Sequence, residues 1–230
     1  MNKTMVSGIT MRRGMMGGSD PITFTFHDYI QCDAVDSSSY IDTELIPNSS
    51  TEWTFEGSFA RTASIPSDYA FRGLFTRFVG GTYSSNYGIL YKAKNQATIA
   101  FNYNSRSNNE SYAGVASTSI NIGEWHTFIL SSSSGVDYGG ECSIDGGTPV
   151  VYNGSRPNSD AVTPLYLLRG YPCRLGQFKV YYQGNLVADM RPATRDTDDA
   201  VGMYDVVRNK FFQPTGASIF ECGDGLTNFF

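Results

Sequence analysis

Short runs of aromatic and β-branched residues, separated by turn-forming residues, recur throughout residues 165–222. Runs of this kind predict short β-strands joined by tight turns. Strands are expected at 165–168, 176–182 and 186–190, with a turn at 183–185, and again at 202–205, 210–213 and 218–222. The segment contains no catalytic motif, so it constrains the fold far more than the chemistry.

The rest of the chain from residue 24 onward continues the pattern. Residues 52–61 show the clearest alternation, with Trp53, Phe55 and Phe59 on one face and Glu52, Thr54, Glu56 and Ser58 on the other. This alternation predicts a sheet with one buried face and one wet face. Further strands are expected at 29–32, 40–43, 69–79, 88–92, 97–103, 124–131, 142–145 and 149–152, with long polar loops at 104–117 and 153–163. About a dozen strands and no amphipathic helix predict an all-β, two-sheet antiparallel sandwich.

Composition agrees with many strands and turns and excludes several functions. The 230 residues include 15 Tyr, 15 Phe and 24 Gly, and only 17% are charged. The net charge of −5 leaves no basic stripe for phosphates, so nucleic-acid binding is not expected. No apolar run reaches the roughly 18 residues that a membrane span needs. The first residues also lack the apolar core of a signal peptide.

Residues 1–20 form a distinct segment, and a jelly-roll domain is expected over residues 21–230. Five of the seven methionines lie in the first 16 positions, among several glycines and without strand or helix periodicity. One interpretation is a frayed terminus. The favoured one is an extended arm that docks on a partner protein, since methionine makes adaptable apolar contacts. The expected partner-binding residues are Met5, Met11, Arg12, Arg13, Met15 and Met16.

Three segments resemble concanavalin A-like (laminin G-like) jelly rolls. The first is YIQCDAVDSSSYIDTELIPNSSTEWTFEGSFA, residues 29–60, and the second is IGEWHTFILSSSSGVDYGGECSIDGG, residues 122–147. The third combines LGQFKVYYQGNLVADMRPATRD with VGMYDVVRNKFF. This closing pattern is similar to a subgroup found in bacteriophage virion proteins and gut-bacterial surface proteins. The resemblance covers roughly residues 24–223 and leaves the arm outside.

The resemblance implies a non-enzymatic structural or binding module. The leading expectation is a bacteriophage virion protein, a multimeric capsid-decorating or head-fibre component assembled in the host cytoplasm. Its arm would attach it to other virion proteins, and whether its jelly roll also binds host or mucus glycans stays open. The alternative is a receptor-binding lectin module of a tail fibre or a bacterial surface protein. Because the fold also hosts glycoside hydrolases, the resemblance alone does not fix the function.

The hydrolase alternative is disfavoured by the spacing of the carboxylates. Retaining and inverting glycosidases need carboxylates roughly 5 Å or 6.5–9.5 Å apart. Glu52 and Glu56, like Glu141 and Asp145, are four residues apart, which is about 13 Å along a strand. His27 and His126 have no nucleophile motif nearby. No enzymatic activity is therefore expected.

No cofactor or metal is expected. Asp196, Asp198 and Asp199 form the best candidate calcium cluster, but their spacing is not that of an EF-hand, and an acidic surface turn is favoured. The four cysteines, Cys32, Cys142, Cys173 and Cys222, form no CxxC motif. They are expected to be buried thiols, with two disulfides as the open alternative.

Carbohydrate binding would need planar aromatic rings beside polar side chains. The long polar loops supply Tyr83, Asn86, Tyr87, Arg106, Tyr112 and Tyr138. These residues are the expected glycan contacts. The same residue types are also common at subunit interfaces, so a homo-oligomer contact is the competing interpretation.

Overall fold

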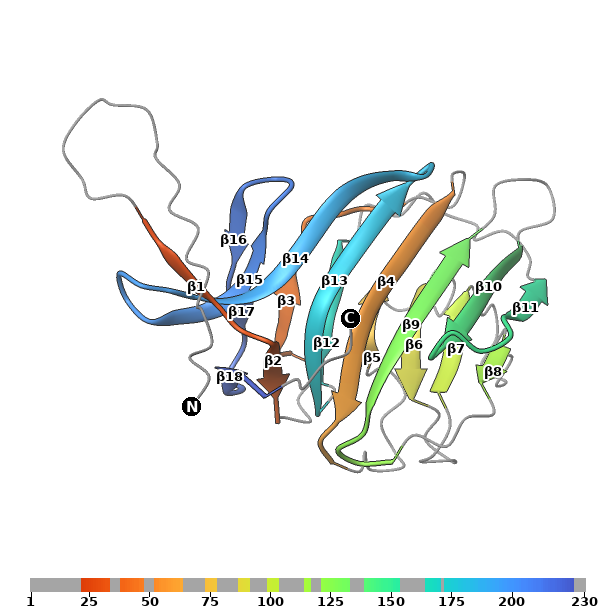
Figure 1. Cartoon of the computed structure of the whole chain (residues 1–230), viewed down its shortest axis with the longest axis horizontal. Coiled ribbons are helices and arrows are strands. Elements are labelled where there is room, and N and C mark those ends of the chain that lie inside the picture. Colours follow the sequence, from red (N-terminus) through yellow and green to blue (C-terminus); the bar gives the residue numbers. More distant parts are fainter. Residues whose placement is uncertain are drawn as a thin grey trace, which may run out of the picture.

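The computed structural model describes residues 22–33, 38–47, 52–63, 73–77, 87–91, 99–103, 114–116, 121–132, 139–153, 164–170 and 172–225. Within these ranges the chain forms only strands, turns and loops. The strands make two antiparallel sheets that pack face to face (Figure 1). The expected all-β sandwich is therefore confirmed.

The large sheet has eleven strands and faces the viewer in Figure 1. Its main path runs, in spatial order, through β11 (Val150–Asn153), β10 (Gly139–Ile144), β9 (Trp125–Ser132), β4 (Trp53–Arg61), β13 (Cys173–Tyr182), β14 (Asn185–Arg195), β15 (Ala200–Asp205) and β16 (Lys210–Phe212). Three short strands complete it: β1 (Phe24–Phe26), β2 (Tyr29–Cys32) and β18 (Phe220–Gly223).

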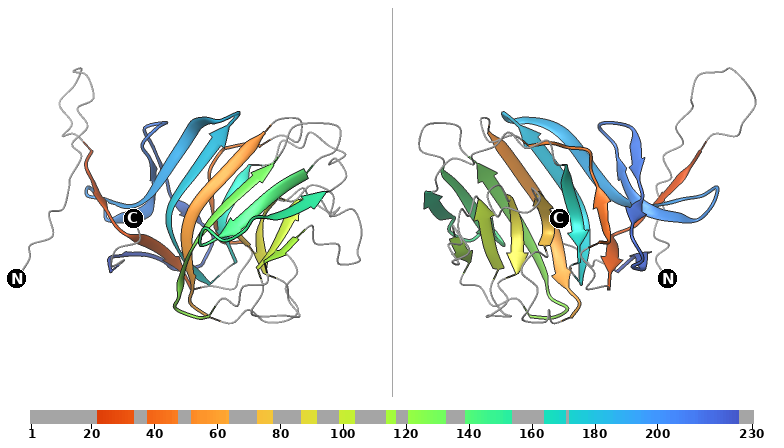
Figure 2. Two further views of the ribbon diagram at one scale, coloured as in Figure 1. Left: turned by 45° about the vertical axis from the view of Figure 1, so that its right-hand side comes forward. Right: turned by 180° about the vertical axis from the view of Figure 1, so that it is seen from behind.

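The small sheet has seven strands and lies behind the large one, as the right-hand view of Figure 2 shows. Its spatial order is β17 (Pro214–Thr215), β3 (Tyr40–Asp42), β12 (Leu165–Arg169), β5 (Gly73–Arg77), β6 (Tyr87–Tyr91), β7 (Ile99–Tyr103) and β8 (Gly114–Ala116). In the described part of the chain, no helix is long and apolar enough to cross a membrane.

The large sheet splits where β13 and β14 separate, and β1 and β2 fill the gap. β14 pairs with β13 through Met190 and then with β1 from Ala193 onward. β2 pairs with the beginning of β13, where Cys173 lies opposite Cys32. The backbone N–H of His27, at the bend between β1 and β2, donates to the carbonyl of Pro192 at 3.0 Å. Proline is tolerated inside β14 because its missing N–H faces this bend and not a continuous strand.

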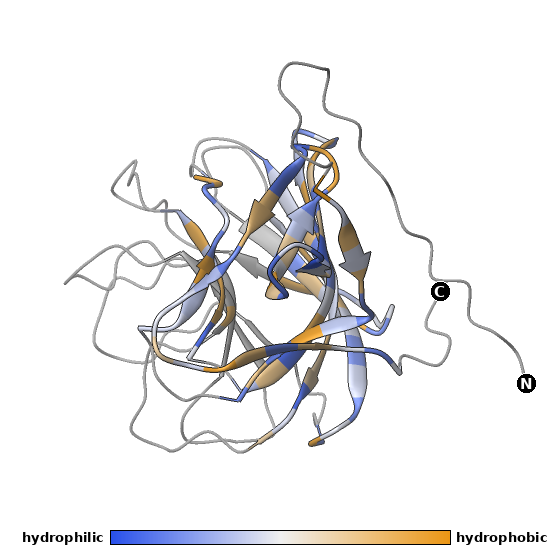
Figure 3. Ribbon diagram, turned by 90° about the vertical axis from the view of Figure 1, so that its left-hand side faces the viewer, coloured by the Kyte–Doolittle hydropathy of each residue, from blue (hydrophilic) through white to orange (hydrophobic). Residues whose placement is uncertain are grey.

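The core lies between the sheets and is built mainly from phenylalanine and leucine. In β4 buried and half-buried residues alternate from Trp53 to Glu56, and the last four residues, Ser58 to Arg61, are all buried. Figure 3 shows apolar and polar residues alternating along the strands. The Phe178 ring lies 6.3 Å from that of Phe55 and 6.4 Å from that of Phe128, measured between centroids. The small sheet covers these rings with fully buried side chains, namely Ile41, Leu74, Leu165, Leu167 and Leu168. Aromatic rings packed at such distances stabilise the core beyond the area that they bury.

The turn predicted at residues 183–185 is a tight hairpin. Gln183 and Gly184 join β13 to β14 with φ angles of 48° and 75°. Two successive positive φ angles are typical of the type I′ turn, whose twist matches that of the strands that it joins. This turn places Tyr182 opposite Asn185 and fixes the register of β14. Asp145 and Gly146, after β10, also have positive φ angles, of 52° and 65°.

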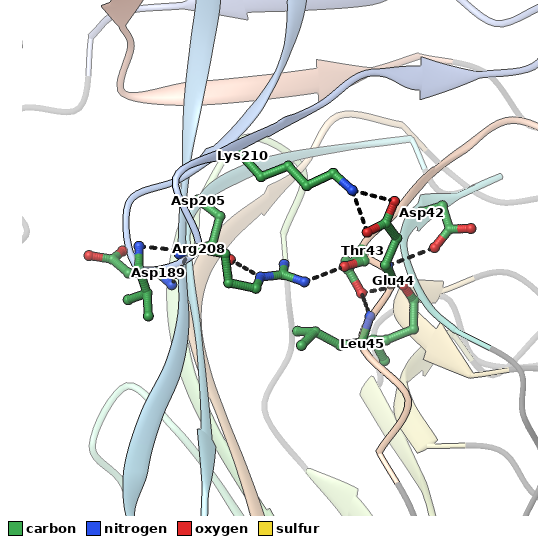
Figure 4. A network of polar contacts seen from close by, with 10 residues as sticks. Asp42, Thr43, Glu44, Leu45, Asp189, Asp205, Arg208 and Lys210 are labelled. Carbon is green, nitrogen blue, oxygen red and sulfur yellow. Dashed lines mark hydrogen bonds and ion pairs between the residues drawn. The ribbon is translucent and has the colours of Figure 1, made fainter. Parts of the chain in front are cut away.

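A buried carboxylate organises the turn between β15 and β16 (Figure 4). Asp205 is 0% exposed. Its Oδ1 accepts hydrogen bonds from the backbone N–H groups of Asp189 (3.1 Å), Val207 (2.9 Å) and Arg208 (3.2 Å). Its Oδ2 accepts a hydrogen bond from Nε of Arg208. One side chain therefore ties this turn to β14 and to a guanidinium.

The same guanidinium connects the two sheets. Nη1 of Arg208 donates to the carbonyl oxygen of Thr43, at the end of β3, at 2.8 Å. Oγ1 of Thr43 donates to the carbonyl of Leu165 in β12 at 2.7 Å. Nearby, Nζ of Lys210 bonds both carboxylate oxygens of Glu44 at 2.7 and 2.5 Å. This network closes one side of the sandwich.

Three details differ from the sequence predictions. β8 lies within residues 104–117, which were expected to be a loop. β14 continues through Arg195, beyond the expected end at residue 190, because the bend opposite Pro192 accommodates a proline. The sequence of β9 is apolar on both faces, which predicts a central strand, and β9 does lie between β10 and β4, but Ile129 is 45% exposed on the outer face. The predicted arm, residues 1–20, lies outside the described residues, so the expected domain boundary stays a prediction.

Candidate functional site

A depression of about 270 Å³ lies on the outer face of the large sheet, away from the core. Four neighbouring strands supply its lining side chains, which are Glu56 and Ser58 from β4, Thr127 and Ile129 from β9, Ser143 from β10, and Gln177 and Lys179 from β13. Small concave sites with a few convergent polar groups are the usual places for small ligands. We call this site the outer depression.

Strand register explains why these side chains meet. Ile129 lies opposite both Ser143 and Glu56, and Glu56 lies opposite Lys179. Directly opposite residues point to the same face of a sheet. One row of the outer depression is therefore Ser143, Ile129, Glu56 and Lys179, and the next row contains Thr127 and Ser58, which also lie opposite each other.

Ser58 stands out among the lining residues. Its side chain is 6% exposed, and its Oγ has no hydrogen-bond partner. A Cβ added to Gly176 would lie 2.3 Å from this oxygen, so the absence of a side chain at Gly176 leaves the hydroxyl its space. A buried hydroxyl without a partner costs about 1–3 kcal/mol. Unpaired polar groups of this kind in native structures call for an explanation, such as a ligand that pairs with them.

Two polar residues of the outer depression, Glu56 and Gln177, are held by neighbouring side chains. Tyr181 donates its hydroxyl to Oε2 of Glu56 at 3.2 Å. Burial, followed by the nearby Glu56 carboxylate, raises the pKa of Tyr181, so this hydroxyl remains a donor at neutral pH. Nε2 of Gln177 donates to Oδ1 of the buried Asp189 at 2.5 Å, and Nη2 of Arg191 donates to its Oδ2 at 2.8 Å. Glu56 and Gln177 thus have fixed positions, and each retains further hydrogen-bonding capacity.

An aromatic cluster lies beside the outer depression on the same face. The rings of Tyr29 and Trp125 are 6.0 Å apart, and the guanidinium carbon of Arg174 lies 4.7 Å from the centre of the Tyr29 ring. Nε of Arg174 donates to Oε1 of Gln31 at 2.7 Å. We call Tyr29, Trp125 and Arg174 the aromatic–arginine cluster. Its half-buried rings and polar groups are of the kind that a sugar ring can contact.

Of the glycan contacts predicted from sequence, Tyr87 alone lies among the described residues, and it is not part of the outer depression. Tyr87 begins β6 in the small sheet. Tyr83, Asn86, Arg106, Tyr112 and Tyr138 lie outside the described residues, as do the predicted arm contacts Met5, Met11, Arg12, Arg13, Met15 and Met16. The alternation in β4 predicts a polar, solvated face, and part of that face lines the outer depression. The other lining residues come from segments far apart in the chain, so no local sequence pattern identifies the site.

Asp145 and the two histidines considered for catalysis have structural partners. Oδ2 of Asp145 lies 2.7 Å from Nδ1 of His126, and its Oδ1 accepts the backbone N–H of Thr127 at 2.8 Å. His27 contacts Asp224 at 3.2 Å and Thr194 at 3.0 Å. These contacts stabilise turns and the bend between β1 and β2.

The candidate calcium cluster is also engaged by protein donors. Arg195 donates from Nε and Nη2 to the two oxygens of Asp198 at 2.8 and 2.6 Å. This hydrogen bonding lowers the pKa of Asp198 below its ordinary value. Asp196 accepts a hydrogen bond from the hydroxyl of Thr25 at 2.9 Å. Among the described residues, no group of three or more acidic, histidine or cysteine side chains is placed to hold a metal ion.

All four cysteines are free thiols, which confirms that expectation. Cys32, Cys142 and Cys173 are buried, and Cys222 is half-buried. Burial raises the pKa of Cys142 and Cys173 well above the ordinary range and that of Cys222 to about 11. Thiols with such pKa values are protonated at neutral pH and are poor nucleophiles.

No family model matches this chain, and no curated protein is significantly similar to it in sequence.

Proposed function

We propose that this chain is a non-enzymatic structural protein of a bacteriophage particle and that its sandwich binds glycans on the outer face of the large sheet. The proposal takes the sandwich to be of the concanavalin A-like jelly-roll type. Residues 1–20 attach it to other virion proteins, as a capsid-decorating or head-fibre component.

Sequence resemblance supports the virion part of the proposal. The closing pattern that is similar to phage virion proteins spans β13 to β16. The Asp205 and Arg208 side chains within it hold the sandwich closed against Thr43, which belongs to the resembling segment at residues 29–60. Two of the three resembling segments thus meet in one buried network.

The observation that carries the glycan part is the unpartnered hydroxyl of Ser58 in the outer depression. A sugar hydroxyl both donates and accepts hydrogen bonds, so it can pair with Ser58 after rotation about the serine χ1 bond. Glu56, Gln177 and Lys179 add an acceptor, an amide and a donor around it. Ile129 and the rings of Tyr29 and Trp125 offer apolar surface for the C–H faces of a sugar ring.

Substituting Ser58 by alanine is expected to weaken glycan binding about five- to tenfold, because one hydrogen bond to the ligand is lost. The same substitution removes a buried hydroxyl without a partner, so the free energy of unfolding is expected to stay unchanged or rise. A glycan array would identify the ligand, and titration calorimetry with denaturant unfolding would measure both quantities. Ser131→Ala is the matched control, since Ser131 lies on the same face but shares a hydrogen bond with Thr54 at 3.2 Å. Absence of binding to any bacterial, mucin or host glycan would contradict the glycan part.

Deletion of residues 1–20 tests the virion part separately. The truncated protein is expected to fold with an unchanged thermal transition and to lose incorporation into particles, because the arm makes the attachment. Co-assembly followed by particle purification and protein gel analysis would measure incorporation. Incorporation at the full-length level would overturn the anchoring role.

The outer depression also favours the alternative, a receptor-binding lectin module of a tail fibre or a bacterial surface protein. That alternative shares the glycan site and differs in attachment. This alternative predicts that the protein binds glycans and that deletion of residues 1–20 does not change where the protein is attached.

A further inference from the structure

In the aromatic–arginine cluster, the Arg174 guanidinium has N–H donors left for a ligand. Arg191, Arg195 and Arg208 each bond a carboxylate of this chain. Arg174, in contrast, has no acidic partner among the described residues, and the Gln31 amide is its hydrogen-bond acceptor there. Since that bond uses Nε, the Nη1 and Nη2 groups keep their N–H donors for another acceptor.

Neighbouring side chains hold Arg174 in a defined position. Nε2 of Gln31 donates to both oxygens of Asp33, at 2.8 and 2.9 Å. Because a carboxylate only accepts, the amide oxygen of Gln31 must face Arg174. The guanidinium also lies over the Tyr29 ring, a cation–π arrangement that favours this position. The donor group is therefore positioned before any ligand arrives.

The cluster and the outer depression lie next to each other on the outer face of the large sheet. Ala60 of β4 lies opposite both Arg174 and Trp125. Ser58 is two residues earlier on the same strand and face, which is about 7 Å along the strand. A ligand of one or two sugar units can therefore reach the Ser58 hydroxyl and Arg174 together.

We propose that Arg174 is a carboxylate-binding residue and that the glycans bound here are acidic, carrying sialic acid or hexuronic acid. This inference rests on the proposed glycan binding. A guanidinium fork matches a carboxylate with two parallel hydrogen bonds, which are stronger than bonds between neutral groups. Tyr29 and Trp125 contact the apolar face of the same sugar. A neutral sugar can make the same apolar contacts but forms no ion pair with the Arg174 guanidinium.

Matched acidic and neutral probes test the inference by titration calorimetry. The first pair is sialyllactose and lactose, and the second is a galacturonic acid trimer and its methyl ester. At least one acidic probe is expected to bind about tenfold or more tightly than its neutral counterpart. Arg174→Met keeps an apolar stem on Tyr29 and is expected to abolish this preference while changing the affinity for the neutral probe less than about threefold. Arg174→Lys keeps the positive charge but loses the two parallel donors of the guanidinium. Its preference for acidic probes is expected to lie between those of the unchanged protein and Arg174→Met.

Lys210→Met is the charge-matched control, because Lys210, at the start of β16, pairs with Glu44 and lies outside the outer depression and the aromatic–arginine cluster. Thermal melts show whether each variant is folded. If Arg174→Met does not fold, Arg174→Lys is used as the test variant in its place. A preference within the sialyllactose pair identifies sialic acid as the ligand, and a preference within the galacturonic acid pair identifies hexuronic acid. Equal affinity for acidic and neutral probes overturns the role of Arg174 and leaves glycan binding standing. Binding of neither class overturns both proposals.

Discussion

Replacing Asp205 with alanine is expected to lower the free energy of unfolding by about 3–5 kcal/mol. The carboxylate is completely buried, and it accepts hydrogen bonds from three backbone N–H groups and from Arg208. Its removal leaves these donors and a positive charge without their acceptor, which is costlier than the loss of an exposed ion pair. Denaturant unfolding measures the change, and the melting temperature is expected to fall by about 10 °C.

Asp198→Ala is the matched control for this experiment. Asp198 also pairs with an arginine three residues away in a turn between adjacent strands, but its side chain is half exposed. Its removal is expected to leave stability nearly unchanged, since water replaces the lost partner. Asp205→Asn keeps the shape, and its effect is expected to lie between the two, because the amide oxygen still accepts part of these hydrogen bonds while the NH2 group faces other donors. Equal, small effects of Asp205→Ala and Asp198→Ala would show that the buried network does not hold the sandwich together.

The strands were predictable wherever local pattern decides structure. In residues 53–61 the alternation of large apolar side chains identified the buried face, and Gln183-Gly184-Asn185 identified the turn between β13 and β14, because both depend on near neighbours. β14 runs beyond residue 190, where the strand was predicted to end, and includes Pro192, although proline is usually confined to edge strands and bulges. Its tolerance depends on His27, which is far away in the sequence and whose N–H bonds the Pro192 carbonyl.

The candidate site was beyond prediction for the same physical reason. Ser58, Thr127 and Gln177 meet because three strands pair in one register, and no local signal states that register. Tyr29, Trp125 and Arg174 likewise come from three distant strands. The outward-facing residues of each predicted strand were the one sequence signal for this site, because together they make up the outer face of a sheet. The aromatic residues in the polar loops form a more obvious pattern, and the predicted glycan contacts came from those loops.

Truncation of Phe178 to alanine is expected to destabilise the fold by about 3–5 kcal/mol, with a melting temperature lower by about 10 °C. Phe178 is 0% exposed and packs between the rings of Phe55 and Phe128, so its loss removes apolar burial and leaves a cavity in the centre of the core. Phe178→Leu keeps most of the volume and is expected to cost about 1–2 kcal/mol. Val151→Ala, at a 67% exposed position on edge strand β11, is expected to change the free energy of unfolding by less than about 0.5 kcal/mol. Denaturant unfolding of the three variants measures this order, and a Phe178→Ala protein as stable as Val151→Ala would contradict the position of the core between the two sheets.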